Sequence, residues 1–423
     1  MIVDAESMSK EFNRRNFLGL MGTVPLISVL PGLKAPGTET ELHPGPGSLP
    51  ENALAEILET KIICIEPGRF PVVSSAIDKN GHPVQTNSSV EPNRYVGWPT
   101  VVLTTENELI VVYSGDRDSH VCPFGKTHLI KSADNGQTWS APVTITNTPL
   151  DDRDAGIIQT RQGTLVVSWF TSLAFENPNW PAAYYKYFRV GEKISAQTKQ
   201  AWLGNWIKRS SDGGKTWLTP SRTVGTAPHG PVNLKSGHLL YVGTGSYQSM
   251  GPILVEKSTD DGITWKVIGN IPVPKKATSI SEPHVIELPS GKLLAMIRNE
   301  SKEFHNGYLL QSESYDGGNT WSMASETAIW GYPPHFTLLK NGELLLSYSH
   351  RKLPYSQKAC ISHDEGRTWD IENEIMLTRS ANSDMGYPST TQLNDDSLLT
   401  VYYQSPGNGE PTNIMSTHWL LKK

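Results

Sequence analysis

The chain has 423 residues, which is long enough to bury a large core as one big β domain or as two ordinary domains. Its 37 basic and 42 acidic residues leave a net charge of −5, which excludes the broad basic footprint of a nucleic-acid-binding protein and favours a small or neutral partner. The 12 Trp, 15 Tyr, 36 Gly and 30 Pro favour a turn-rich all-β chain or one that contacts carbohydrate.

The amino terminus carries an export pattern. In "NRRNFLGLMGTVPLISVLPGLKA", Arg14 and Arg15 precede an apolar stretch that Gly and Pro interrupt. Such a start is typical of an export signal, with a retained anchor or a chance Arg-Arg pair as the alternatives. We predict a twin-arginine-type signal peptide over residues 1–35, a Pro/Gly linker over 36–52 and one folded domain over 53–423. The expected product is a bacterial periplasmic or secreted protein without a membrane span after signal removal.

The three cysteines, Cys64, Cys122 and Cys360, are odd in number and widely spaced. They imply no disulfide framework and form no CxxC metal motif. We therefore expect no cofactor and no required metal, although acidic loops can hold calcium without a clear signature. Nothing in the sequence indicates the oligomeric state.

One short segment recurs five times with the pattern S-x-D-x-G-x-T-W. Its copies are "SADNGQTW" (132–139), "SSDGGKTW" (210–217), "STDDGITW" (258–265), "SYDGGNTW" (314–321) and "SHDEGRTW" (362–369). Asp followed two residues later by Gly suits a tight turn, because Asp bonds nearby backbone amides and Gly tolerates positive φ. The Thr-Trp pair begins a strand and adds an apolar plug. We predict that these aspartates hold turns and are not catalytic.

A second repeat is a pair of apolar strands joined by a polar turn, and it occurs six times. The leucine after the turn is Leu109, Leu165, Leu239, Leu293, Leu344 or Leu398. Hairpins that alternate with Asp-turns make about six four-stranded units, which indicates an all-β, six-bladed β-propeller rather than an open sandwich. The strand near "KIICIE" (61–66) is expected to pair with the carboxy-terminal "IMSTHWLL" and to close the ring, which accounts for the missing sixth Asp-turn.

A long aromatic interval follows the second hairpin, "FENPNWPAAYYKYFRVGEKISAQTKQAWLGNW" (175–206). Long intervals of this kind are often functional loops. Its aromatic residues form either a lid over the site or a satellite core.

Equivalent positions at the start of each first strand converge on one rim, because that strand lies nearest the propeller axis. Aligning the six leucines gives a ring of Trp98, Asp154, Pro228, Glu282, Pro333 and Tyr387, followed by Pro99, Ala155, His229, Pro283, Pro334 and Pro388. The antiparallel second strand returns to the same rim. It brings Asp116, Arg117, Asp118, Arg298 and Arg351. The Asp-turns follow the third strand and fall at the opposite end.

The rim also gathers four histidines, His120, His229, His284 and His335. Arginine forks recognise carboxylates in a bidentate manner, and paired carboxylates are the usual equipment of glycosidic cleavage. The rim is therefore a candidate acidic-sugar site. The alternative for each residue taken alone is structural: a salt-bridged arginine, a packed tyrosine or a channel-lining histidine.

Five Asp-turns on a six-bladed pattern resemble the Asp-boxes of the sialidase superfamily over residues 60–420. In that family a glutamate begins an inner strand and an arginine ends the next one, and "SEPHVIELPSGKLLAMIR" matches this with Glu282 and Arg298. Tyr387 in "GYPSTTQL" matches the family's tyrosine, and Arg351 matches its third arginine less tightly. The Asp-boxes are specific for the fold and weaker for the activity.

The resemblance implies that Tyr387 is the nucleophile and that Glu282 draws its proton. A neutral phenol can approach an anomeric carbon that carries a carboxylate, where a carboxylate nucleophile would be repelled. An acid from the first blade would protonate the leaving oxygen. We assign this role to Asp118, with Asp116 and His120 as alternatives.

The chain departs from the family at the start of the first blade. Sialidases have Arg-x-Pro there, whereas "VGWP" places Gly97 at the arginine position. Arg94 or Arg117 is expected to substitute; otherwise the site has lost a charge-assisted fork worth about 1.5–3 kcal/mol per hydrogen bond. Trp98 would offer a stacking platform. The predicted substrate-binding residues are Arg298, Arg351, Arg117, Arg94, Trp98, Asp154, Asp116, His120, His229 and His335.

The sequence thus predicts an exported, sialidase-like exo-glycosidase that removes a terminal, acidic sugar from a glycan with retention. One alternative is a hydrolase or lyase that acts on a uronic-acid or other polysaccharide with histidine acid/base chemistry. Another is a non-catalytic glycan-binding propeller. The expected partner is a glycan or oligosaccharide, and no nucleic acid.

Overall fold

The computed structural model describes residues 53–65, 76–77, 83–84, 94–179, 184–245, 252–407 and 410–422. The predicted signal peptide over 1–35 and linker over 36–52 lie outside these residues. Every described element belongs to one compact unit, Ser48–Lys423. Among the described residues, no helix combines the length and apolar character needed to cross a membrane.

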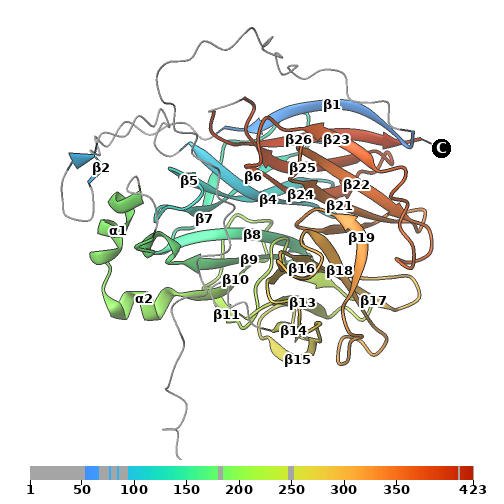
Figure 1. Cartoon of the computed structure of the whole chain (residues 1–423), viewed down its shortest axis with the longest axis horizontal. Helices are drawn as coiled ribbons and strands as arrows, with labels where there is room; N and C mark the ends of the chain where they lie inside the picture. Colours follow the sequence, from blue (N-terminus) through green and yellow to red (C-terminus); the bar gives the residue numbers. More distant parts are fainter. Residues whose placement is uncertain are drawn as a thin grey trace, which may run out of the picture. The chain divides into compact units, whose positions relative to one another are not determined.

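Six four-stranded antiparallel sheets, here called blades 1 to 6, make up the described fold (Figure 1). Blade 1 contains β4 (Tyr95–Leu103), β5 (Leu109–Arg117), β6 (Lys126–Ser132) and β7 (Val143–Thr146). Blade 2 contains β8 (Asp151–Gln159), β9 (Leu165–Ser172), β10 (Gly204–Ser210) and β11 (Ser221–Thr223). Blade 3 contains β12 (Val232–Asn233), β13 (Leu239–Thr244), β14 (Ile253–Ser258) and β15 (Lys266–Ile271).

The remaining strands follow the same order. Blade 4 contains β16 (Ile280–Glu287), β17 (Leu293–Asn299), β18 (Tyr308–Ser314) and β19 (Ser325–Trp330). Blade 5 contains β20 (His335–Leu338), β21 (Leu344–His350), β22 (Ser356–Ser362) and β23 (Ile375–Arg379). Blade 6 contains β24 (Met385–Gln392), β25 (Leu398–Gln404), β26 (Asn413–Leu421) and β1 (Ala55–Cys64). A separate short pair joins β2 (Ala76–Ile77) to β3 (Pro83–Val84).

Blade 6 takes its outer strand from the other end of the chain. β1 lies beside β26 (Figure 1) and pairs with it antiparallel, with Lys61 opposite Ser416 and Ile62 opposite Met415. This confirms the predicted pairing, although the strand begins six residues before the predicted segment, at Ala55. Because the fourth strand does not follow the third in sequence, blade 6 needs no Asp-turn.

Six apolar clusters join each blade to the next and close the ring. Representative pairs are Ile110 with Ile157, Val166 with Tyr241, Val242 with Val285, Leu294 with Leu346, Leu345 with Leu398, and Leu399 with Val111. The six leucines used for the alignment are all at most 1% exposed. Burying each such side chain stabilises the fold by about 1.5–3 kcal/mol. The described chain is therefore the predicted six-bladed β-propeller and not an open sandwich.

The Asp-turns are held by their own side chains. In blade 4, Thr320 donates from its backbone N and from Oγ1 to the two carboxylate oxygens of Asp316, at 2.9 and 2.6 Å. Ser314 Oγ donates to Asp316 Oδ1 at 2.9 Å and accepts from Gly318 N at 3.0 Å. The same bonds recur around Asp134, Asp212, Asp260 and Asp364. These aspartates have the predicted structural role.

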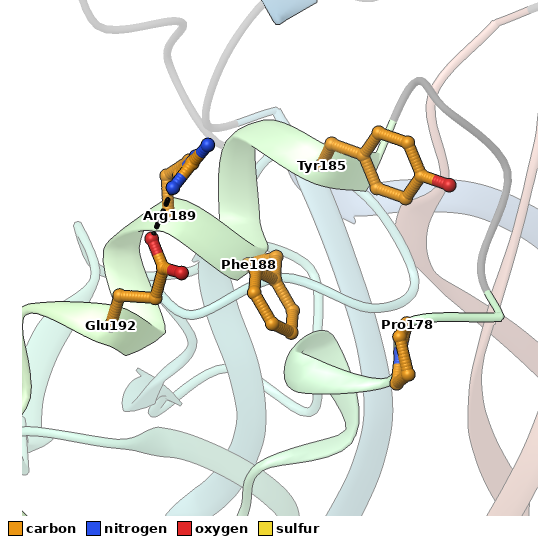
Figure 2. Close-up of a pocket in the computed structure, with 5 residues that line it drawn as sticks. All are labelled: Pro178, Tyr185, Phe188, Arg189 and Glu192. Carbon is orange, nitrogen blue, oxygen red and sulfur yellow. Dashed lines mark hydrogen bonds and ion pairs between the residues drawn. The ribbon is translucent and has the colours of Figure 1, made fainter. Parts of the chain in front are cut away.

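The aromatic interval of blade 2 forms a helical insertion with η1 (Ala174–Glu176), α1 (Tyr185–Glu192) and α2 (Ala196–Trp202). Phe175 and Tyr187 are buried against Val121 and Cys122, which makes a small core of its own. Figure 2 shows a hollow beside α1 lined by Pro178, Tyr185, Phe188, Arg189 and Glu192, in which Arg189 and Glu192 pair with each other. Of the two alternatives, the described residues favour the satellite core.

Candidate functional site

Inner strands of the propeller begin with backbone strain. Five non-glycine residues there, Trp98, Asp154, His229, Glu282 and Tyr387, have φ between 48° and 69°. In blades 1, 2, 4 and 6 a break in strand register falls at the same place. Such bulges re-aim side chains, and left-handed backbone at these residues costs on the order of 1 kcal/mol each. In blade 3 the residue is His229, which corrects the aligned Pro228 by one position.

Glu282 links Tyr387 to Arg298. The Tyr387 hydroxyl donates to Glu282 Oε1 at 2.7 Å, and Arg298 Nη1 donates to Glu282 Oε2 at 2.6 Å. The second guanidinium nitrogen, Nη2, pairs with Glu300 Oε2 at 2.8 Å. Glu282 and Tyr387 are buried. Glu282 and Arg298 of blade 4 therefore meet Tyr387 of blade 6, as predicted, although Tyr387 is far from the other two in sequence.

The Tyr387 phenol is held neutral. Burial raises its pKa well above the ordinary value, and the carboxylates of Glu282 and Asp154 raise it further, against Arg298 and Arg351. Loss of its proton thus requires an acceptor at contact distance. The hydrogen bond to Glu282 supplies one.

Asp154 is the most perturbed carboxyl beside this pair. It is 2% exposed, and burial raises its pKa to about 7, with Arg153 opposing and Glu282 adding to the rise. Among the described residues, its Oδ1 has no hydrogen-bond partner. A carboxyl that holds its proton near neutral pH can donate a hydrogen bond to a ligand.

Two arginines share one side of the cluster. The guanidinium groups of Arg298 and Arg351 lie 4.3 and 5.4 Å from the centre of the Tyr332 ring. Arg351 Nε donates to the carbonyl of Met385 at 2.9 Å. Within the described part of the chain, Arg298 Nε and Arg351 Nη2 are buried without partners. Buried donors of this kind are suited to a polar or anionic ligand.

Trp98 and Arg117 lie in different surroundings from those predicted. Trp98 is 1% exposed, and the guanidinium groups of Arg153 and Arg117 lie 4.3 and 4.8 Å from its ring centre. The ring is thus covered, which corrects the expectation of an open stacking platform. Arg117 has no exposed surface, because its Nη1 and Nη2 bind Asp151 at 2.5 and 3.0 Å. Its geometry favours a scaffold role over a substitute for the missing arginine.

The first-blade acids also have protein partners. Asp118 accepts a hydrogen bond from Tyr187 of α1 at 3.2 Å and lies 3.8 Å from Lys186 Nζ. Asp116 pairs with Lys126 at 2.5 Å. Arg94 precedes β4 and is partly exposed. The structure thus places Asp118 against the helical insertion.

The histidines predicted to line the channel meet in one cluster. Ring centres of His284 and His335 lie 4.7 Å apart in a stack, and His229 lies 4.8 Å from His335. Burial lowers all three pKa values, that of His284 to about 3. Thr390 N and Phe336 N donate to Nδ1 of His335 and His284, so both rings are neutral. Among the described residues, no group of His, Cys, Asp or Glu has the arrangement of a metal site.

Sequence reasoning missed Tyr95 and Asp384, which hold His120. Tyr95 Oη donates to Asp384 Oδ1 at 2.7 Å and lies 2.9 Å from His120 Nδ1. Asp384 comes three residues before Tyr387, which was the only available signal. Nearby, a Cβ built on Gly97 would lie 3.6 Å from the Tyr95 ring and 3.9 Å from the Tyr403 ring.

The fold and this cluster define a six-bladed propeller of the sialidase-like superfamily. Residues 185–401 match the family model described as a BNR repeat-like domain. This match covers just over half of the chain, and the chain therefore belongs to that family.

Known relatives cover different shares of the chain. A sialidase from Paraclostridium sordellii is 27% identical over 243 residues, which are 50% of this chain and 52% of that protein. The chain thus spans about half the length of this curated relative. A protein of unknown function from Dyadobacter fermentans superposes with a TM-score of 0.66 at 22% identity, over 87% of this chain and 99% of that one. The NanB sialidase of Streptococcus pneumoniae superposes with a TM-score of 0.57 at 15% identity, over 80% and 70%. At these identities the structures support the fold alone.

Proposed function

We propose that the protein is a retaining exo-glycosidase that hydrolyses a terminal sugar from a glycan, with Tyr387 as nucleophile and Glu282 as its base. The observation that carries this proposal is the 2.7 Å hydrogen bond from the Tyr387 hydroxyl to Glu282 Oε1. A nucleophile bonded to a base that a third group orients is the usual signature of covalent catalysis. Arg298, at 2.6 Å from Glu282 Oε2, is the orienting group.

The reaction has two steps. Tyr387 Oη attacks the anomeric carbon while its proton passes to Glu282, and the bond to the leaving oxygen breaks as an acid/base group gives that oxygen a proton. Water then attacks the same carbon and loses a proton to the same acid/base group, the bond to Tyr387 breaks, and Glu282 returns its proton to the phenol. Two displacements at one carbon retain its configuration.

The charges around Tyr387 support a sugar with an acidic group. Arg298 Nε and Arg351 Nη2 have no partner among the described residues, so both can donate to a carboxylate. The third arginine of the resembling family is replaced by Gly97. We therefore propose an acidic terminal sugar whose carboxylate, carried on the anomeric carbon, is held by two arginines rather than three. The Arg14–Arg15 pattern supports export to a compartment in which such glycans occur.

The test is an activity panel of aryl sialosides, uronides and neutral glycosides with three proteins. Tyr387→Phe is expected to lower kcat/KM at least about a thousandfold on every substrate that the wild type cleaves, because the nucleophile is gone. Tyr315→Phe is the matched control, since Tyr315 is 76% exposed in an Asp-turn. It should leave activity unchanged.

The anomeric configuration of the product provides a second test. Proton NMR of the first sugar formed should show the anomer of the substrate. An inverted product, or full activity of Tyr387→Phe, would rule out the tyrosine mechanism. Glycan binding without turnover on any bound glycan would identify a binding protein instead.

A further inference from the structure

His120 sits in a hydrogen-bonded relay at the open edge of the site. The single proton of the Tyr95 hydroxyl goes to Asp384 Oδ1, so the Tyr95 oxygen accepts from His120 Nδ1–H, at 2.9 Å. Asp384 Oδ1 also lies 3.5 Å from His120 Nδ1. These bonds place the proton of the neutral ring on Nδ1 and leave the lone pair on Nε2. Among the described residues, nothing bonds to that Nε2.

The loop that carries His120 is rigidly held. The backbone carbonyl oxygen of His120 accepts hydrogen bonds from Arg117 Nη2 and Arg153 Nη1, both at 3.1 Å. Its ring stands edge-on to Trp98 at 5.1 Å. The imidazole side chain is still 37% exposed. A base fixed on one nitrogen and open on the other has the geometry of a proton-transfer group.

His120 is one aromatic ring away from the nucleophile. The Trp98 ring neighbours both: its centre lies 5.1 Å from that of the His120 ring and 6.4 Å from that of the Tyr387 ring. Asp384 directly precedes β24, and Arg351 binds the carbonyl of Met385, the first residue of that strand. By contrast, the Asp118 carboxylate is engaged by Tyr187 and Lys186 of the insertion.

We propose that His120 Nε2 is the acid/base group of the reaction and that Tyr95 and Asp384 are its positioning residues. In the first step the imidazolium gives its Nε2 proton to the glycosidic oxygen as that bond breaks, while the Tyr387 proton goes to Glu282. In the second step the neutral Nε2 takes a proton from water as the water oxygen attacks the anomeric carbon. The inference rests on the proposed glycosidase function.

The charges that face His120 set the direction of its titration. Burial lowers the pKa of His120, Asp384 raises it, and Arg153 and Arg117 lower it again. Tyr95 bridges the ring to Asp384, and Tyr184 faces Asp384 from the insertion. The acid form therefore prevails below the ordinary histidine range, and Asp384→Asn should move the alkaline limb of the kcat/KM profile to lower pH.

The experiment compares two glycosides of one sugar, a dinitrophenyl glycoside whose leaving group needs no proton and a methyl glycoside whose leaving group does. His120→Gln is expected to lower kcat/KM on the methyl glycoside by about 100-fold to 10,000-fold, and on the dinitrophenyl glycoside by less than about tenfold. Tyr387→Phe should abolish both reactions. Thermal unfolding of each variant checks that the fold is intact.

The outcomes separate this inference from the function on which it rests. Equal losses on both substrates in His120→Gln, or a selective loss in Asp118→Asn or Asp154→Asn instead, would overturn the role of His120. An unmoved pH profile in Asp384→Asn would overturn the positioning role. If Tyr387→Phe stays active while His120→Gln shows selective loss, the tyrosine assignment fails and His120 stands. If the wild type cleaves nothing, both proposals fall.

Discussion

Aspartates at the two ends of the propeller titrate in opposite directions. At the Asp-turn end, hydrogen bonds from the Thr138 side chain and backbone lower the pKa of exposed Asp134 to about 2. At the other end, burial raises the pKa of Asp154 to about 7. The first carboxylate satisfies a turn and the second has an unbonded oxygen. At the Asp-turn end the carboxylate thus stabilises a turn, whereas at the other end Asp154 Oδ1, Arg298 Nε and Arg351 Nη2 are left without partners among the described residues.

The difference follows from the repeat itself. Every Asp-turn carries the same Ser, Asp, Gly and Thr, so each turn satisfies its own polar groups locally. At the inner-strand end five blades place a different residue at the same left-handed position, and several of these residues find partners across blades. Departures from a repeat are where function is expected, because an identical residue in every blade can only build a symmetrical structure.

Removing Arg298 should have the largest effect on the free energy of unfolding. Arg298→Met leaves the buried Glu282 and the partly exposed Glu300 without their counter-charge, and we expect a loss of roughly 3–5 kcal/mol in the free energy of unfolding. Urea denaturation measures it. Lys340→Met is the control, because Lys340 and Asp396 are 49% and 71% exposed at the opposite end and such pairs contribute about 1 kcal/mol or less. Equal losses of unfolding free energy in the two variants would mean that charged pairs at the two ends of the propeller contribute equally to stability.

Stability against pH should separate Asp154 from Asp134. Asp154 keeps its proton to about pH 7 in the folded protein, whereas the ordinary value is 3.8, so its contribution is present at low pH and lost as the pH rises through that window. Relative to wild type, Asp154→Asn should therefore gain roughly 2–4 kcal/mol from low pH to above pH 7. Asp134 titrates in the other direction: its contribution is present above the ordinary value and lost as the pH falls toward 2.

Urea unfolding of the wild type, Asp154→Asn and Asp134→Asn across this range tests both signs. Asp152, whose pKa burial also raises to about 7, is present in all three proteins and shifts them together. A difference between Asp154→Asn and wild type that does not change with pH would show that Asp154 is not protonated in the fold.

The contacts that sequence reasoning predicted are those that a repeat specifies. The five Asp-turns and the six hairpins follow from periodic residues, the pairing of β1 with β26 follows from the closure of the ring, and the alignment also brought Glu282, Arg298 and Tyr387 to one rim. The burial of the Trp98 ring could not be predicted from the repeat, because the guanidinium group that covers it comes from Arg153 of the next blade. The contact between Asp118 and Tyr187 did not follow for a related reason: Tyr187 comes from the helical insertion of blade 2 and not from the repeat. Tyr95 and Asp384 join the two ends of the sequence and match no motif.

Gly97→Arg should have the smallest effect on the fold and a specific effect on the ligand. A Cβ at Gly97 lies at ordinary contact distances from Tyr95 and Tyr403, so the backbone can accept a side chain. An added guanidinium gives the two-arginine site a third charge, with each charge-assisted hydrogen bond worth about 1.5–3 kcal/mol. We expect a carboxylated sialic acid analogue to bind about 10-fold to 100-fold more tightly by calorimetry.

Gly97→Met separates charge from bulk in this test, since it fills the same space without a donor. If Gly97→Arg binds the analogue no better than Gly97→Met does, then Gly97 is not what sets this site apart from a three-arginine clamp. The His120–Asp384 edge would then be the determinant. Asp384 lies next to Tyr95, whose ring faces Gly97, so its negative charge would disfavour a carboxylate at that corner even with the arginine restored. Asp384→Asn combined with Gly97→Arg should in that case recover the tighter binding, because the opposing charge is removed while the donor is kept.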